Sequence, residues 1–300
     1  MAAAPAAVDA LPVVLLPVGP DDAAHDATLA ALDAGTPAGT RVWLADDACA
    51  GPRGIAIIER WREATALCAD YTRRQRQAGA VVHLDEALSA CGDVDVAVLA
   101  CDARPGPGWL QQLSACLARD PSIGTATPWS NAGEAAAWPR LGEVGAMPSA
   151  TELAALARAA SGMPPRHPEL PSAVGHAVLL RGGARVRAGG LDGASYGSWH
   201  AALVDLSLRL AGQGWRNALC ETAYVACAGE GMPVDGDLDV LAARWPGWHP
   251  RLARFLMDDP LRAAREALSA RLAAAGSTVQ ADLFDDGDAD AVARAAGSAA

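Results

Sequence analysis

Short apolar runs alternate with longer amphipathic segments through the first half of the chain. The apolar runs predict strands at 11–18, 41–45 and 94–100, and the amphipathic segments predict helices at 23–34, 55–68 and 80–90. Strands and helices in alternation are typical of right-handed βαβ units around a mainly parallel sheet. We therefore expect an α/β fold with a doubly wound, mostly parallel, Rossmann-like sheet.

Polar residues follow three of these predicted strands. Gly19 comes after the first, Asp46 and Asp47 after the second, and Asp102 after the third. Ligands of open α/β sheets bind beyond the carboxyl ends of the strands, where such residues meet. The pattern alone therefore indicates a ligand pocket at this edge.

The second half of the chain has a less regular pattern. It predicts a loop at 129–147, helices at 151–160 and 201–213, a proline-rich connector at 162–171, strands at 173–181 and 218–227, and one or two helices over 238–274. The ends, 1–10 and 276–300, are rich in small and acidic residues and are expected to be disordered. We expect one domain over 11–275 with a C-terminal helical extension.

Composition narrows the functional classes. The net charge of −11 disfavours nucleic-acid binding, and all 24 basic residues are arginine. No apolar run reaches the roughly 18 residues of a membrane helix, and the alanine-rich start has no basic segment typical of a signal peptide. The seven cysteines form no C-x-x-C pair. They indicate reduced, buried thiols in a soluble, cytoplasmic protein.

Common catalytic motifs are absent or weak. No G-x-G-x-x-G follows a strand, and a chain without lysine has no Walker A motif. Residues 193–197 (GASYG) fit the G-x-S-x-G elbow that would make Ser195 the nucleophile of an α/β-hydrolase. That elbow needs a buried strand directly before it, whereas 187–192 is rich in glycine and charge. A flexible loop is the favoured interpretation.

Ordered motifs over nearly all of 11–270 resemble the family 2 glycosyltransferases of GT-A type, with the second half most similar to bacterial polysaccharide-type members. The matching segments are 13–18 (VVLLPV), 45–48 (ADDA), 77–79 (QAG), 98–103 (VLACDA), 107–110 (PGWL), 123–131 (IGTATPWSN), 173–181 (AVGHAVLLR), 189–192 (GGLD), 205–209 (DLSLR) and 214–217 (GWRN). The resemblance implies transfer of a sugar from a nucleotide-sugar donor to a glycan or lipid-linked acceptor in surface polysaccharide synthesis. It also implies peripheral association with membrane-bound glycan machinery.

The resemblance assigns residues to the donor site. Residues that match the nucleotide-binding motifs are Pro17, Gly19, Asp46, Asp47 and Gly79. Asp102 matches the second acid of the D-x-D motif and would hold Mg²⁺ or Mn²⁺, which neutralises the diphosphate leaving group.

The catalytic-base motif is degenerate. The family's acidic pair falls on Ala202 and Leu203, and its histidine near the diphosphate falls on or beside Cys227. Three explanations stay open. Asp205 or His200 serves as the base, or the protein transfers with retention or only binds, or the domain is a scaffold for an active partner.

Overall fold

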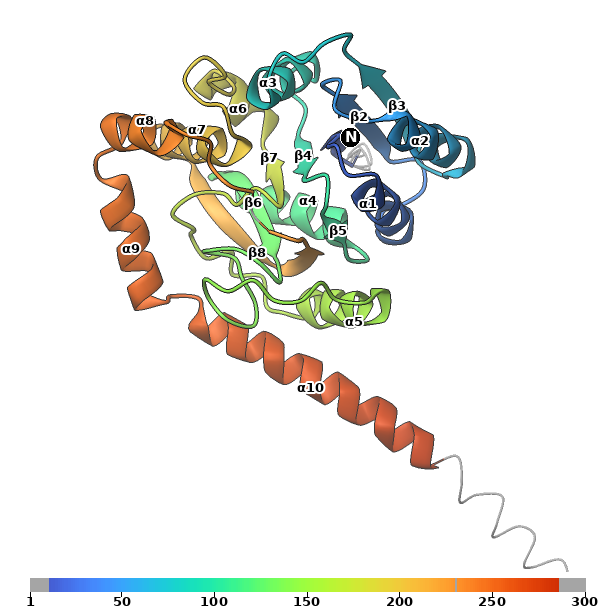
Figure 1. The fold of residues 1–300 in the computed structure, drawn as a ribbon. Coiled ribbons are helices and arrows are strands. Elements are labelled where there is room, and N and C mark those ends of the chain that lie inside the picture. The colour runs from blue at the N-terminus through green and yellow to red at the C-terminus, as the bar shows by residue number, and fades with distance from the viewer. Residues whose placement is uncertain (1–10, 230, 286–300) are drawn as a thin grey trace, which may run out of the picture.

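The computed structural model describes residues 11–229 and 231–285, with side chains up to residue 275. The strands are β1 (Val13–Pro17), β2 (Arg41–Asp46), β3 (Cys68–Arg73), β4 (Val96–Leu99), β5 (Arg104–Pro105), β6 (Ile123–Trp129), β7 (Ala177–Leu180) and β8 (Arg216–Ala226). The helices are α1 (Asp22–Gly35), α2 (Pro52–Ala64), α3 (Ala80–Ala90), α4 (Trp109–Arg119), α5 (Ala150–Ser161), α6 (Gly182–Ala188), α7 (Trp199–Gly212), α8 (Asp237–Arg244), α9 (Trp248–Asp258) and α10 (Arg262–Asp285). Figure 1 shows them around one central sheet.

The sheet has the order β3-β2-β1-β4-β7-β6-β8-β5. Strands β1 to β4 are parallel to one another, and β6 is parallel to β8. Strand β7 is antiparallel to both of its neighbours, and β5 is antiparallel to β8. Strand β7 is reversed because it starts at the carboxyl end of β4, where Ala177 pairs with Leu99. The mostly parallel arrangement therefore describes the first half of the sheet better than the second.

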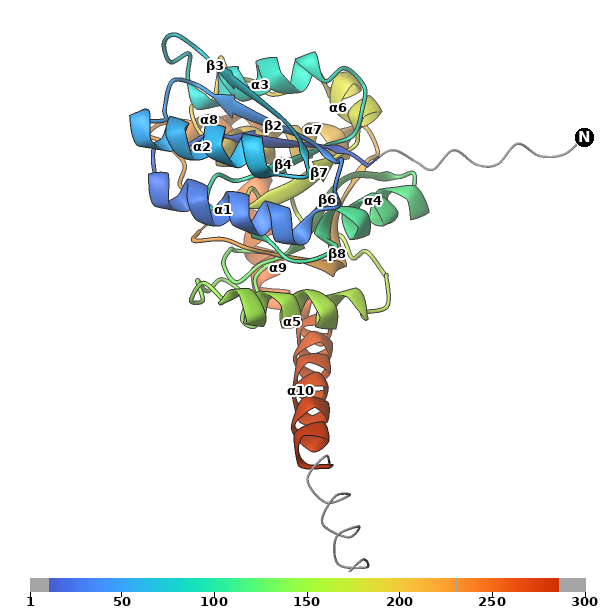
Figure 2. The same cartoon turned by 90° about the vertical axis from the view of Figure 1, so that its right-hand side faces the viewer.

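Helices cover both faces of the sheet, so the predicted α/β doubly wound architecture is confirmed. On one face α1, α2 and α4 contribute Leu32, Ile58 and Leu113 to a core with β1, β2 and β4. On the other face α3 and α7 bury Leu84 and Leu206. A third cluster joins α5 and α10 to the outer strands β6 and β8. Figure 2 shows α5 and α10 below the main body.

Several predicted elements need correction. The helix expected at 55–68 ends at Ala64, and β3 begins at Cys68. Strand β3 lies at the sheet edge with exposed and half-buried residues, so it has no apolar run that would reveal it. The C-terminal segment forms three helices where one or two were expected, because Pro260 ends α9 as well as Pro246 ending α8.

The expectations for the chain ends and the cysteines have mixed outcomes. Helix α10 continues to Asp285, into the segment 276–300 expected to be disordered, while 1–10 and 286–300 lie outside the described residues. All seven cysteines are free thiols, but only Cys116, Cys220 and Cys227 are buried, and Cys68 is exposed. No described helix is both long and apolar enough to cross a membrane.

Asp205 connects the main domain to the helical extension. Its carboxylate is fully buried on α7 and accepts hydrogen bonds from Arg209 Nε at 2.8 Å, Arg244 at 3.1 Å and Trp245 Nε1 at 2.8 Å. The Tyr196 hydroxyl donates a fourth at 3.3 Å. Arg244 and Trp245 lie at the end of α8, so this single carboxylate ties α7 to the first helix of the extension.

Asp205→Asn should therefore destabilise the protein by about 2–4 kcal/mol, because it removes the buried negative charge that two arginines share and replaces one of the two acceptor oxygens with an N–H donor. Urea unfolding measures this change. Asp192 pairs with the same Arg244 at 2.8 Å but is partly exposed, so Asp192→Asn is the matched control and should cost less than about 1 kcal/mol. Equal midpoints for the two variants would contradict the anchoring role.

Candidate functional site

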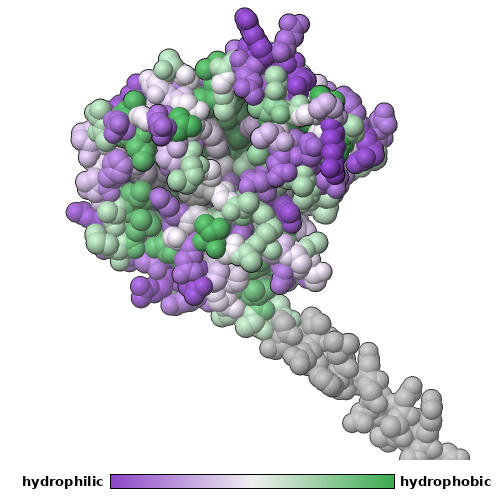
Figure 3. Space-filling model, viewed as in Figure 1, coloured by the Kyte–Doolittle hydropathy of each residue, from purple (hydrophilic) through white to green (hydrophobic). Residues whose placement is uncertain are grey.

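The residues predicted to form a pocket do meet at the carboxyl edge of the sheet. Pro17 at the end of β1 pairs with Ala45, directly before Asp46 and Asp47. Gly19 lies against Cys101, where an added Cβ would come within 2.8 Å of the Cys101 Sγ. Glycine at position 19 thus permits the loop after β1 to approach the loop after β4. Figure 3 views the face onto which these strand ends point, and the surface is hollowed near its centre.

Asp46 shapes this edge from inside. Its fully buried carboxylate accepts from the Cys49 N–H at 2.6 Å, the Ala50 N–H at 3.3 Å and the Tyr71 hydroxyl at 2.7 Å, and it pairs with Arg73. Burial on its own would raise the pKa of Asp46, but these donors together lower it below its ordinary value. Asp46 is therefore ionised at neutral pH, and its oxygens are already occupied by donors of the protein.

The Asp47 side chain is hydrogen-bonded to the backbone of Gly79. The Asp47 carboxylate accepts from the Ala78 N–H at 2.8 Å and the Gly79 N–H at 2.9 Å, and Arg74 Nε lies 3.7 Å away. Gly79 has a φ of +103°, a conformation that side-chain-bearing residues rarely adopt, and it begins α3. Asp47 therefore holds the loop before α3 against the end of β2, and both residues line the same edge.

Asp102 lies half-buried in the loop after β4. Burial is the main cause that raises the pKa of its carboxyl group, and the nearby Asp21 carboxylate adds to the effect. The Ala228 N–H, beyond the end of β8, and Arg104 act in the opposite direction. A buried carboxylate with a second acid nearby favours a bound cation.

A divalent metal fits Asp102 only if other groups complete its coordination. The described residues contain no group of three His, Cys, Asp or Glu side chains that could hold a metal. Mg²⁺ is commonly held by one or two carboxylates together with substrate phosphates, and Asp102 suits that arrangement. Cys227 offers little help, because its thiol is buried against the Ser130 Oγ at 3.3 Å.

Ala202 and Leu203, at the positions of the missing acidic pair, are both buried on α7 and have apolar side chains. Leu203 instead lines a small cavity together with His200 and Glu134. Burial lowers the pKa of His200, while the carboxylates of Glu134 and Asp237 act against that shift. His200 is therefore a neutral imidazole near pH 7, the form that accepts a proton.

Glu134 is a candidate residue that the sequence pattern does not reveal. It lies on the loop after β6, three residues beyond the IGTATPWSN motif, in a segment without periodicity. Asp205, the other predicted base, lies within the buried network that joins α7 to α8, with four donors on its carboxylate. The structure thus brings His200 and Glu134 together and separates Asp205 from them.

The hydrolase interpretation of Ser195 is wrong. The segment before Gly193 is helix α6 followed by turns, and no strand enters the motif. Ser195 Oγ accepts from Arg244 at 3.3 Å rather than donating to a histidine. Its loop therefore belongs to the surface beside α8.

Comparisons with known proteins locate the fold. No protein-family model and no curated protein matches the sequence. GalNAc-T7, solved with UDP, GalNAc and Mn²⁺, is 12% identical with a TM-score of 0.58 over 87% of this chain, which spans only 55% of the GalNAc-T7 chain. The mannosyltransferase PcManGT of Pyrobaculum calidifontis, solved with GDP-Man and Mn²⁺, is 17% identical with a TM-score of 0.54, covering 93% of this chain and 80% of its own.

Residues 1–349 of S. aureus TarS, solved with UDP-GlcNAc, are 12% identical with a TM-score of 0.52, covering 87% of this chain and 71% of theirs. Identities this low establish the fold rather than the reaction. The chain has the α/β fold of the GT-A glycosyltransferases.

Proposed function

We propose that this protein is a family 2 glycosyltransferase that transfers a sugar from a nucleotide-sugar donor to a glycan acceptor in surface polysaccharide synthesis. The observation that carries the proposal is the shared edge of Gly19, Asp47, Gly79 and Asp102 at the carboxyl ends of β1, β2 and β4. The three compared proteins with this fold were solved with UDP, GDP-Man or UDP-GlcNAc. A cytoplasmic location with peripheral association to membrane-bound glycan machinery belongs to the same proposal.

The donor is bound by two parts of the edge. The loops held by Asp46 and Asp47 form the nucleoside side, where Pro17 and the backbone at Gly79 face the base and ribose. Asp102 would hold Mg²⁺ or Mn²⁺ at the diphosphate side, and the metal would supply positive charge to the leaving phosphate. The raised pKa of Asp102 supports this role, because a bound cation removes the cost of keeping its carboxylate ionised in a buried place.

His200 is the proposed base in place of the missing acids. It precedes Ala202 by two residues on the first turn of α7, and it shares a cavity with Leu203. The neutral imidazole accepts the proton of the acceptor hydroxyl, and the Glu134 carboxylate stabilises the imidazolium that results. Glu134 thus acts as a positioning residue.

Asp102→Ala should remove the metal-dependent part of nucleotide binding. Calorimetric titration of UDP and GDP, each with and without Mn²⁺, measures it, and the variant should bind both equally with and without the metal. Asp26→Ala is the control, because Asp26 is a surface residue of α1 paired only loosely with Arg60 at 3.7 Å. Unchanged Mn²⁺-dependent affinity in Asp102→Ala would remove this residue from the donor site.

His200→Gln should lower kcat by about 10²–10⁴-fold, the usual contribution of a general base. Because the unprotonated imidazole is the active form, activity falls as pH drops through its pKa. Burial lowers that pKa, so the acid limb of the rate profile should lie below pH 6.5. Glu134→Gln removes a carboxylate that raises the pKa of His200, and it should move the limb to still lower pH.

A profile that does not move in Glu134→Gln, with full activity in His200→Gln, would exclude this pair. The second candidate function is a GT-A domain that binds donor or partner without catalysis. The burial of Ala202 and Leu203 and the occupied carboxylate of Asp205 are the observations that favour this alternative. Nucleotide binding without turnover, for inverting and retaining products alike, would identify it.

A further inference from the structure

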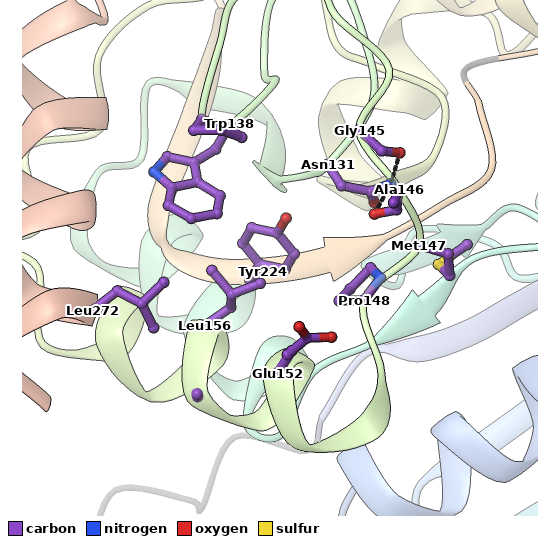
Figure 4. A pocket seen from close by; sticks show the side chains of 12 residues that line it. Asn131, Trp138, Gly145, Ala146, Met147, Pro148, Glu152, Leu156, Tyr224 and Leu272 are labelled. Atoms are coloured by element: carbon purple, nitrogen blue, oxygen red, sulfur yellow. Dashed lines mark hydrogen bonds between the residues drawn. The ribbon is translucent and has the colours of Figure 1, made fainter. Parts of the chain in front are cut away.

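An apolar pocket lies beside the candidate site, between the loop that follows β6, helix α5, strand β8 and helix α10. It has a volume of about 350 Å³. Its walls are mainly the side chains of Trp138, Pro139, Met147, Pro148, Leu156 and Leu272. In Figure 4 the side chains of Trp138, Leu156 and Leu272 lie around Tyr224.

Tyr224 supplies an unusual polar group to this pocket. Its side chain is 1% exposed, and its hydroxyl has no hydrogen-bond partner among the described residues. In Figure 4 the hydroxyl points toward the gap between Trp138 and Asn131. Burial raises the pKa of the phenol, so it stays protonated and can donate. An unpaired buried hydroxyl costs folding free energy, which a ligand oxygen would recover.

The loop that closes the pocket is held at both ends. Asn131 Nδ2 donates to the Cys227 carbonyl at 2.9 Å and to the Gly145 carbonyl at 3.1 Å, and its Oδ1 accepts from the Cys227 N–H at 2.9 Å. The Trp138 indole N–H donates to the Ser269 hydroxyl at 3.1 Å, and its ring meets the Tyr224 ring edge-on with centroids 6.3 Å apart. The Trp138 ring therefore lies beside the Tyr224 ring in the wall of the pocket.

The charges around the pocket select against anions. Among its lining residues none is cationic, and Glu152 is an acid. The Ser149 hydroxyl and N–H bond the Glu152 carboxyl group and lower its pKa, so it is ionised at neutral pH. A negatively charged ligand would meet this carboxylate without a compensating arginine. The site therefore favours an uncharged ligand with an apolar body and one oxygen that accepts a hydrogen bond.

The pocket is linked to the proposed donor site by a single short segment. Strand β8 carries Tyr224 into the pocket, Cys227 is bonded to Asn131 at its rim, and the next N–H, from Ala228, reaches Asp102. The end of β8 therefore connects a ligand held in this pocket to Asp102, the proposed metal ligand.

We propose that this pocket binds the alkyl part of an uncharged alkyl glycoside, with Tyr224 donating a hydrogen bond to an oxygen of its sugar. Its use as the acceptor subsite rests on the glycosyltransferase function proposed above. The site itself stands on the geometry of the pocket and does not require that function.

Ligand-observed saturation-transfer NMR with octyl β-glucoside, below its critical micelle concentration, tests the site. We expect binding of octyl glucoside, and no measurable binding of methyl glucoside, which has no chain, or of octanoate, which is charged. Ala155→Phe fills the pocket from α5 and should abolish binding, whereas Ala154→Phe on the neighbouring groove should leave it unchanged. Equal binding of octanoate and octyl glucoside, or intact binding in Ala155→Phe, would overturn the site.

Tyr224→Phe separates a ligand-binding hydroxyl from a structural one. The variant should bind octyl glucoside about three- to tenfold more weakly, the usual effect of one neutral hydrogen bond. Its thermal unfolding midpoint should stay equal or rise, because an unpaired buried hydroxyl is removed. A lower midpoint with unchanged affinity would show that the hydroxyl serves the fold alone.

Donor turnover then tests the acceptor role separately. If octyl glucoside stimulates release of nucleoside diphosphate in the native protein, Ala155→Phe should remove the stimulation and Ala154→Phe should keep it. Stimulation that survives in Ala155→Phe would overturn the acceptor role. If no nucleotide-sugar donor is turned over, the proposed function is wrong. The NMR experiment would still show whether the pocket binds octyl glucoside.

Discussion

The carboxyl edge of this sheet depends on two adjacent carboxylates at the end of β2. Asp46 bonds the N–H groups of Cys49 and Ala50 and the hydroxyl of Tyr71, and Asp47 bonds the N–H groups of Ala78 and Gly79. Each buried backbone donor needs an acceptor, and these two side chains supply the acceptors for two loops at once. Moving either loop away from the edge would break these hydrogen bonds, so the shape of the candidate site follows from this pair.

An acid that occupies a motif position in the sequence need not be a catalytic acid. Asp205 and Asp46 both match motif positions in the sequence, yet each is fully buried with four donors of the protein around it. Asp102 is different, because it is half-buried and burial raises the pKa of its carboxyl group, whereas the donors around Asp46 lower the pKa of that residue. Because the protein stabilises the ionised form of Asp102 less well, this carboxylate is the one that we propose to bind a metal and, through it, a diphosphate.

Much of the fold could be predicted from local patterns. Helix α3 has the predicted bounds, Ala80–Ala90, because its apolar residues repeat at helical spacing after Gly79. Strand β3 could not be predicted, since an edge strand with few buried residues lacks both the alternation and the apolar run that mark a strand. The meeting of Gly19, Asp46, Asp47 and Asp102 at one edge was predictable because the ends of parallel strands share that edge.

Features that join distant segments were out of reach of the sequence. The four donors of Asp205 include Arg244 and Trp245, about forty positions along the chain, and no local pattern pairs them. Glu134 meets His200 across a loop without periodicity, and the pocket at Tyr224 needs the loop after β6, α5 and α10 to be folded together. Such contacts depend on tertiary packing.

We propose above all that Asp102 and the strand ends around it bind a metal and a nucleoside diphosphate. Anomalous X-ray scattering from crystals grown with Mn²⁺ and UDP or GDP tests it most directly. We expect a manganese peak at coordination distance from the Asp102 carboxylate, with the nucleoside between the loops held by Asp46 and Asp47. A nucleotide bound with its metal away from Asp102, or no nucleotide at this edge, would contradict it.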